Sequence, residues 1–423
     1  MTLVIDGISD RAEGVGREGG RAVFVPFAIP GERVTVAEAS RSRRRSARLL
    51  RVDAPSPDRV TPDCRVFGEC GGCQLRHVRY PAQLALKARI LQDALRTVAR
   101  LEAGPIEVAP SPRTLGYRNH VRVRVEAGPD GGARFGFFGE ESRRLVPFER
   151  CQLMPEPFLP ALEALREPLG RLARRRRLAG EVWLRHAENT GETLVTLVGL
   201  LPGDGVEALA AVPGMCGVLH KPSSRERPAA RPLWGKDHLV EEALGVRFSL
   251  RAESFFQVNT PQARALFSRV VSLAGRPAGP IVDAYCGVGV LARLLAARGW
   301  RAVGIELQHD TVEWARRDAS ADPQPVEFIA GAVEEALPRL VKEGLRPAAA
   351  ILDPPRAGCH ERVLDSLRQA EVRRLIMVSC HPGTLARDLH RLFGRGYRLG
   401  GIEAFDMFPH TAHLECLATL DLG

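Results

Sequence analysis

Short apolar runs broken by glycine and proline mark the first part of the chain. Between residues 1 and 55, apolar runs such as 22–25 and 33–36 alternate with glycine and proline residues. Short alternating runs of this kind are typical of short strands, so we expect a small β-barrel there. Residues 56–104 then read as a linker, a cysteine-bearing loop at 64–73 and a connecting helix at 83–100.

The remainder of the chain contains two regions that differ in the pattern of their apolar residues. Residues 105–250 combine strand-like segments with a basic helix ending near Arg174–Arg177, which indicates an α+β region. From residue 251 to 423, apolar strands alternate with helical segments; the strands are expected at 281–282, 302–305, 349–352 and 375–378, and the helices at 290–298, 311–320 and 384–393. This alternation predicts an α/β domain with a parallel sheet covered on both faces. Ligands bind such sheets at the carboxyl ends of the strands.

The charge balance adds a class of partner. The 423 residues include 60 Lys and Arg against 50 Asp and Glu, a net charge of +10, and the Arg-rich stretch 41–48 follows the expected barrel. An excess of positive charge favours polyanionic partners such as RNA. The alternative is that the charge only keeps the protein soluble. No apolar run reaches the roughly 18 residues of a membrane span, and the first residues lack a secretory signal. We therefore expect a cytoplasmic protein with no membrane partner and no evident obligate protein partner.

A cofactor site is expected at the ends of the first two strands of the α/β domain. Asp283 ends the first strand, Gly287 opens the turn, and Glu306 ends the next strand. The glycines alone also satisfy a relaxed dinucleotide fingerprint. Asp283 favours S-adenosylmethionine over a dinucleotide, because a carboxylate there repels a pyrophosphate but attracts the amino and sulfonium groups of S-adenosylmethionine. Glu306 suits the two ribose hydroxyls of either cofactor.

Further polar residues flank that site. Pro354 and Pro355 stop a later strand and fix its loop, so Asp353 is expected to face the substrate base or the cofactor. Gln257, in the segment 255–260, is a candidate for the same two partners.

A nucleophile is expected at Cys380. This cysteine directly follows the strand ending at Ser379 and precedes a helix, whose positive end favours a thiolate. An inert buried thiol is the alternative. Glu415 is the candidate base in the tail, with His410 and His413 as alternatives.

A second group of cysteines has metal-ligand spacing. Cys64, Cys70 and Cys73 form C-x5-C-x2-C around a Gly-Gly hinge, and Cys151 is the candidate fourth ligand. Four thiolates suit an iron–sulfur cluster or zinc. Nine cysteines in 423 residues are too few for a disulfide framework. The remaining thiols are read as ordinary residues, namely Cys216, Cys286, Cys359 and Cys416.

Five motifs together resemble a known family, the RNA 5-methyluridine (uracil-5) methyltransferases. They are Phe-Phe-Gln-Val-Asn-Thr, Asp-x-Tyr-Cys-Gly-x-Gly, Asp-Pro-Pro-Arg-x-Gly, Val-Ser-Cys-x-Pro-x-Thr-Leu-Ala-Arg-Asp and Asp-Met-Phe-Pro-His-Thr-x-His-Leu-Glu, in the family's order and spacing. The resemblance covers essentially the whole chain, because residues 1–55 are similar to the family's RNA-binding barrel, the OB-like TRAM domain. It implies a Rossmann-like class I methyltransferase domain over residues 251–423.

The resemblance also implies roles for single residues. Cys380 would add to carbon 6 of uracil, which makes carbon 5 nucleophilic, and Glu415 would then remove the proton from carbon 5. Cofactor and base contacts are implied for Gln257, Tyr285, Glu306 and Asp353. One position departs from the pattern: members usually show Asn where this chain has Val290, so one polar cofactor contact is in doubt.

The cluster-bearing branch of this family implies two further expectations. Its four cysteines hold a 4Fe-4S cluster, which this chain would bind through Cys64, Cys70, Cys73 and Cys151. Its bacterial members mostly act on ribosomal RNA, so 23S ribosomal RNA is the favoured substrate, with uridine 54 of transfer RNA as the alternative.

Three other functions stay open at this point. The glycine pattern and the cysteines also suit a dinucleotide-dependent iron–sulfur oxidoreductase. A methyltransferase for an exocyclic amine would need no thiol, whereas one for cytosine could use Cys359. The barrel and the basic segments alone would suit a non-catalytic RNA-binding module.

Overall fold

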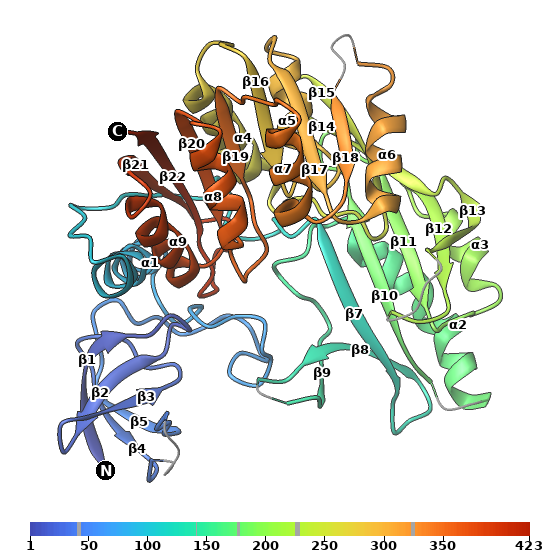
Figure 1. Ribbon diagram of the computed structural model, residues 1–423. Helices are drawn as coiled ribbons and strands as arrows, with labels where there is room; N and C mark the ends of the chain where they lie inside the picture. Colours follow the sequence, from blue (N-terminus) through green and yellow to red (C-terminus); the bar gives the residue numbers. More distant parts are fainter. Residues whose placement is uncertain (40–43, 141, 176–177, 225–228, 323–325) are drawn as a thin grey trace. The chain divides into compact units, whose positions relative to one another are not determined.

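The protein forms two compact units in the computed structural model (Figure 1). The structure describes residues 1–39, 44–140, 142–175, 178–224, 229–322 and 326–423. The first unit contains residues 1–111, 354–359 and 377–423, and the second contains 112–353 and 360–376. Of the helices in the described part of the chain, none is long and apolar enough to cross a membrane.

The first unit begins with a five-stranded antiparallel sheet of order β3-β2-β1-β4-β5. Its strands are β1 (Thr2–Ile8), β2 (Gly14–Glu18), β3 (Arg21–Val25), β4 (Arg33–Val36) and β5 (Leu49–Ala54). Alternate residues such as Leu3, Ile5 and Val34 are buried together, as period-2 patterning requires. The expected short strands are therefore present. A closed barrel stays a prediction, because within the described residues β3 and β5 form the two edges of this sheet, and Phe24 makes an isolated bridge to Ser46.

The Arg-rich stretch is described only in part, because Arg41 and Arg43 lie outside the described residues. Arg44 pairs with Glu13 and lies 4.0 Å from the centroid of the Phe24 ring. Arg45 pairs with Glu18. These two arginines are therefore partly neutralised by acidic residues of the same small sheet.

Helices α1 and α9 and three strands complete most of the first unit. The helix expected at 83–100 is α1 (Tyr80–Ala94), which begins with Pro81 in its first turn and continues into the π-helical turn η1 (Leu95–Ala99). It packs against α9 (Pro382–Phe393) and β6 (Val108–Ala109). Strands β21 (Tyr397–Phe405) and β22 (Glu415–Leu422) are antiparallel, and β6 is parallel to β21.

The eight-stranded sheet confirms the expected α/β fold, although its strands β21 and β22 are antiparallel. Its order is β18-β17-β16-β19-β20-β22-β21-β6. The further strands are β16 (Pro280–Ala284), β17 (Arg301–Glu306), β18 (Glu327–Ala330), β19 (Ala349–Leu352) and β20 (Arg374–Ser379). The helices between them are α4 (Thr260–Ala274), α5 (Val290–Ala296), α6 (His309–Ala319), α7 (Val333–Lys342) and α8 (Glu361–Gln369). The pairs β16–β17, β16–β19 and β17–β18 are parallel, so their carboxyl ends share one edge.

The second unit contains a seven-stranded sheet of order β13-β12-β11-β10-β7-β8-β9. Its strands are β7 (His120–Ala127), β8 (Ala133–Phe138), β9 (Leu145–Pro147), β10 (Ala179–His186), β11 (Thr193–Val198), β12 (Met215–Lys221) and β13 (Arg231–Gly235). Helices α2 (Phe158–Arg175) and α3 (Gly205–Ala210) and a hairpin of β14 (His238–Ala243) and β15 (Val246–Arg251) accompany it. The expected basic helix is α2, although Arg176 and Arg177 lie outside the described residues.

Candidate active site

A sharp turn joins β16 to α5 at the carboxyl edge of the sheet. Tyr285 adopts a φ of +67°, and Gly287 and Gly289 have φ of +55° and +81°. A Cβ atom on Gly289 would lie 2.4 Å from the ring of Phe328, so only glycine fits there. The glycine spacing seen in the sequence therefore serves a close approach between the turn and β18.

A small pocket opens at this turn. Its lining includes five residues expected from the sequence, Gln257, Asp283, Tyr285, Gly287 and Asp353. Its cavity volume is about 50 Å³, and Phe255 in its lining is 66% exposed.

Two acidic side chains give the pocket its electrostatic character. Burial, together with the nearby Asp353 carboxyl, raises the pKa of Asp283 to about 8. Burial likewise raises the pKa of Asp353 to about 7. One Asp283 oxygen accepts a hydrogen bond from the backbone N–H of Ala292 at 2.9 Å, and the other has no partner within the described parts of the chain. Such a pair favours a cation between the carboxyls, because a positive charge stabilises both ionised forms.

Glu306 does not line the pocket but is fixed beside it. Its two carboxylate oxygens accept hydrogen bonds from the backbone N–H groups of Gly287 at 3.1 Å and Gln308 at 3.0 Å. The acid at the end of β17 is thereby tied to the glycine turn. The orphaned Asp283 oxygen and this anchored carboxylate fit the sulfonium and the ribose of S-adenosylmethionine.

Asn119 is a residue of this site that the sequence reasoning missed. Its side-chain amide donates to the backbone oxygen of Gln257 at 3.0 Å and to the hydroxyl of Thr260 at 2.9 Å. Its backbone N–H donates to the oxygen of Val258 at 2.8 Å. Asn119 thus holds the segment that presents Gln257. The only signal in the sequence was a polar residue directly before an alternating strand.

The expected nucleophile and base lie together in the first unit. Cys380 is partly exposed after β20, and His381 caps α9 by accepting a hydrogen bond from the Thr384 N–H. Glu415 is 2% exposed at the start of β22, the strand next to β20. Burial, then the charges of Glu415 and Cys380, raise the pKa of Cys416 well above its usual value.

The alternative bases and nucleophile are less suited. Burial and the nearby Arg76 lower the pKa of His410 to about 4, and its Nδ1 lies 3.1 Å from the Gln83 amide nitrogen. His413 is exposed. Cys359 is only 3% exposed, whereas Cys380 is accessible.

The four cysteines expected to bind a cluster divide between the two units, because Cys64, Cys70 and Cys73 lie in the first and Cys151 lies in the second. Cys64, Cys70, Cys73 and Cys151 are all partly exposed. Among the residues that the structure describes, no three Cys, His, Asp or Glu side chains are grouped closely enough to hold a metal ion. The spacing supplies suitable donors, and a cluster held by all four cysteines stays a prediction.

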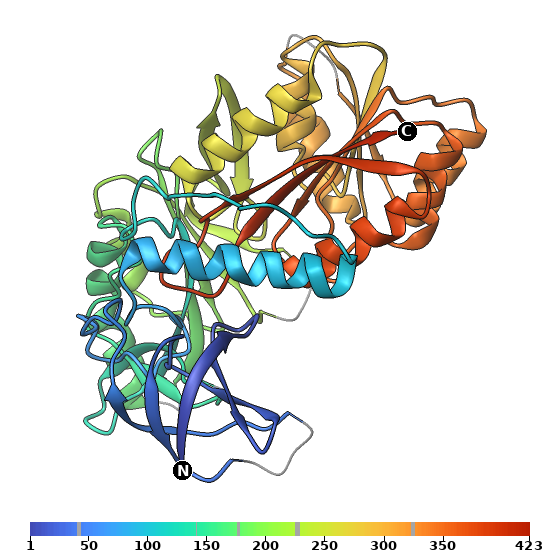
Figure 2. The same cartoon turned by 90° about the vertical axis from the view of Figure 1, so that its left-hand side faces the viewer.

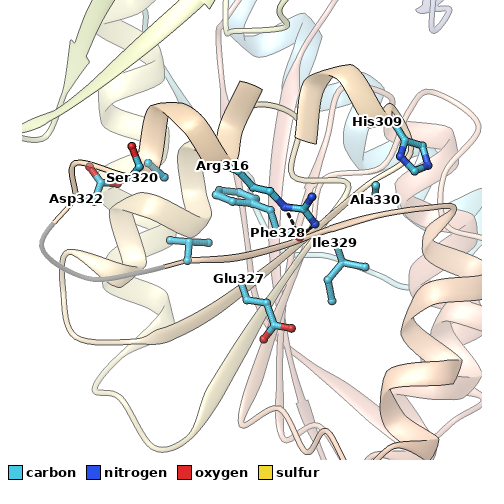
Figure 3. A pocket seen from close by; sticks show the side chains of 10 residues that line it. His309, Arg316, Ser320, Asp322, Glu327, Phe328, Ile329 and Ala330 are labelled. Carbon is cyan, nitrogen blue, oxygen red and sulfur yellow. Dashed lines mark hydrogen bonds between the residues drawn. The ribbon is translucent and has the colours of Figure 1, made fainter. Parts of the chain in front are cut away.

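A larger hollow lies between α6 and β18 (Figure 3). Its cavity volume is about 730 Å³, and none of the expected site residues lines it. Arg316 in its wall donates to the backbone oxygen of Phe328 through Nε at 3.1 Å and Nη2 at 2.5 Å. Asp322 accepts from Arg293 at 2.6 Å. These polar groups already have protein partners, so the smaller pocket is the better candidate for a cofactor.

Comparison with known proteins shows the family of the chain. A sequence profile of the tRNA (uracil-5-)-methyltransferase family matches residues 236–421. An uncharacterized RNA methyltransferase of Thermosynechococcus vestitus is 37% identical over 444 residues, covering 99% of this chain and 97% of its own. Another, from Halalkalibacterium halodurans, is 31% identical over 449 residues, covering 100% of this chain and 97% of its own.

One solved structure is similar over the same length. It is the tRNA (uracil-54, C5)-methyltransferase of Pyrococcus abyssi in complex with S-adenosyl-L-homocysteine, with 28% identity and a TM-score of 0.79. The similarity covers 99% of this chain and all of that one.

Proposed function

Because the chain belongs to the family of S-adenosylmethionine-dependent RNA uracil-5-methyltransferases, we propose that it methylates a ribosomal RNA uridine through a covalent bond to Cys380. The observation that carries this proposal is that the partly exposed Cys380 and the buried Glu415 stand at the end of β20 and the start of β22, which are neighbouring strands of one sheet. An exocyclic amine would need no such thiol. A non-catalytic RNA-binding module would need neither group.

The cofactor residues proposed from the sequence each contact a different part of the cofactor or shape the turn beside it. Asp283 and Asp353 attract the positive charge, since their buried carboxyls gain from a cation. Glu306 accepts hydrogen bonds from the ribose hydroxyls, while Tyr285 and Gly287 shape the turn. S-adenosylmethionine supplies an electrophilic methyl group when bound. Gln257, on the segment held by Asn119, contacts the cofactor or the uracil edge.

The proposed chemistry belongs to Cys380 and Glu415. The Cys380 thiolate, favoured by the N-terminus of α9, adds to carbon 6 of uracil and leaves an enolate whose carbon 5 takes the methyl group. Glu415 then accepts the proton from carbon 5. The electrons of that C–H bond form the carbon 5–carbon 6 double bond, and the C–S bond breaks with its pair returning to sulfur.

Ribosomal RNA is proposed as the substrate, and the cytoplasm as the place of action. The resemblance of the cysteine pattern to the cluster-bearing bacterial branch supports this choice. Transfer RNA is the second candidate, favoured by the similarity to the Pyrococcus abyssi enzyme. Purified protein should form 5-methyluridine in unmodified 23S ribosomal RNA at one position, as mass analysis of nucleolytic fragments would show. Product on transfer RNA alone would replace this substrate with the second candidate.

We further propose that Cys64, Cys70, Cys73 and Cys151 bind a 4Fe-4S cluster. Support comes from their spacing and from their partial exposure. Anaerobically purified protein should contain iron and acid-labile sulfide in equal amounts, and Cys70→Ser should remove most of both. Cys216→Ser is the matched control. Zinc without sulfide would contradict the proposal in favour of the alternative metal.

A further inference from the structure

Helix α1 carries two polar side chains that are fully buried. Gln83 and Lys87 lie one helical turn apart, and each is 0% exposed. Burial of an amide or an ammonium group is unfavourable unless hydrogen-bond partners replace water. Both side chains find those partners in residues 406–412, the segment that connects β21 to β22 and leads to Glu415 (Figure 2).

Lys87 binds this connection at two points. Its Nζ donates to Oδ1 of Asp406 at 2.5 Å and to the backbone oxygen of Phe408 at 3.0 Å. Asp406 is also 0% exposed. Removing either charge would leave the other buried without its partner, so this contact strongly favours one position of the connection against α1.

Gln83 binds the connection at His410. Its Oε1 accepts from the His410 backbone N–H at 2.9 Å, and its Nε2 donates to the oxygen of Val78 at 2.8 Å. His410 adopts a φ of +67°, which a residue other than glycine seldom adopts without external support. The hydrogen bonds to Gln83 supply that support.

The segment after Cys73 binds the same connection from its other side. The backbone N–H groups of Gln74 and Leu75 donate to the oxygen of His410 at 3.1 and 2.9 Å. The Gln74 side chain accepts from the N–H of Ala412 at 3.4 Å and donates to the oxygen of Gly71 at 3.0 Å. Residues 406–412 are therefore held between α1 and the cysteine-bearing loop.

We propose that Gln83 and Lys87 are positioning residues for the base. They fix the connection whose far end is Glu415, only three residues beyond Ala412. This inference rests on the proposed role of Glu415 as the group that takes the proton from carbon 5. Addition of Cys380 and transfer of the methyl group precede that step. Loss of the contacts that Gln83 and Lys87 make with residues 406–412 should therefore slow product release more than methyl transfer.

The test compares the two steps in Gln83→Leu and Lys87→Met under single-turnover conditions with labelled S-adenosylmethionine and substrate RNA. Release of methylated RNA should slow by about tenfold or more, whereas methyl transfer changes by less than about threefold. A methylated protein–RNA adduct that survives denaturation should accumulate. Gln92→Leu and Arg89→Met, on other faces of α1, are the matched controls and should keep both rates.

The opposing results are equally specific. Equal slowing of both steps would show a merely structural role, and unchanged rates would show no role. If Lys87→Met does not fold, Lys87→Met combined with Asp406→Leu removes both buried charges and provides the same comparison. Glu415→Gln separates this inference from its premise: no adduct there overturns the base itself, whereas an adduct there but none in Gln83→Leu overturns only the positioning role.

Discussion

Glu415→Gln is expected to stop the reaction after one methyl transfer and to leave RNA covalently attached to the protein. Glutamine preserves the size of the side chain but cannot take the proton from carbon 5. The double bond therefore cannot re-form and the C–S bond persists. Turnover should fall by about 10²- to 10⁴-fold, the usual contribution of a general base.

The measurement is a denaturing gel with methyl-labelled S-adenosylmethionine, in which label should migrate as a protein–RNA species. Up to one methyl group per protein should appear in a burst. Glu403→Gln, on the adjacent strand β21, is the control and should turn over normally. If Glu415→Gln releases free methylated RNA at the normal rate, another group is the base.

Cys380→Ala should abolish 5-methyluridine formation, with a loss of roughly 10⁴-fold or more. Carbon 5 of uracil is too weakly nucleophilic to take a methyl group unless a thiolate has first added to carbon 6. Cofactor binding should survive, because none of the pocket-lining residues is Cys380. Nucleoside analysis of the RNA and calorimetric binding of S-adenosylhomocysteine measure the two properties separately.

Cys359→Ala is the informative comparison for this thiol. Cys359 is 3% exposed and its backbone N–H donates to Asp388 at 2.7 Å, so its side chain is expected to contribute packing and not chemistry. That variant should retain the activity that Cys380→Ala loses. The reverse pattern would identify Cys359 as the nucleophile and restore the cytosine alternative.

The sequence predicted that Asp283, Gly287 and Glu306 lie near one another because the determinants of this grouping are local. Asp283 and Glu306 stand at the carboxyl ends of β16 and β17, Gly287 lies in the turn after β16, and parallel strands bring their carboxyl ends to one edge of the sheet. The spacing alone therefore placed these residues near one another. The same reasoning placed Cys380 before a helix, which begins at Pro382.

The long-range hydrogen bonds that support the candidate site residues could not be predicted in this way. Lys87 meets Asp406 across 319 positions, and Asn119 meets Gln257 across 138. Hydrogen bonds between such distant residues leave no periodic trace in the sequence, and a buried lysine looks like a surface lysine until its partner is known. The spacing of the cysteines identifies candidate metal ligands, but it does not establish that their thiols lie close together in space.

Peptide mapping of the Glu415→Gln adduct tests the covalent account most directly. After protease and nuclease digestion, mass spectrometry should find a nucleotide that carries one added methyl group attached to the peptide containing Cys380. Attachment to another cysteine, or formation of 5-methyluridine by a protein that never becomes bonded to RNA, would contradict it.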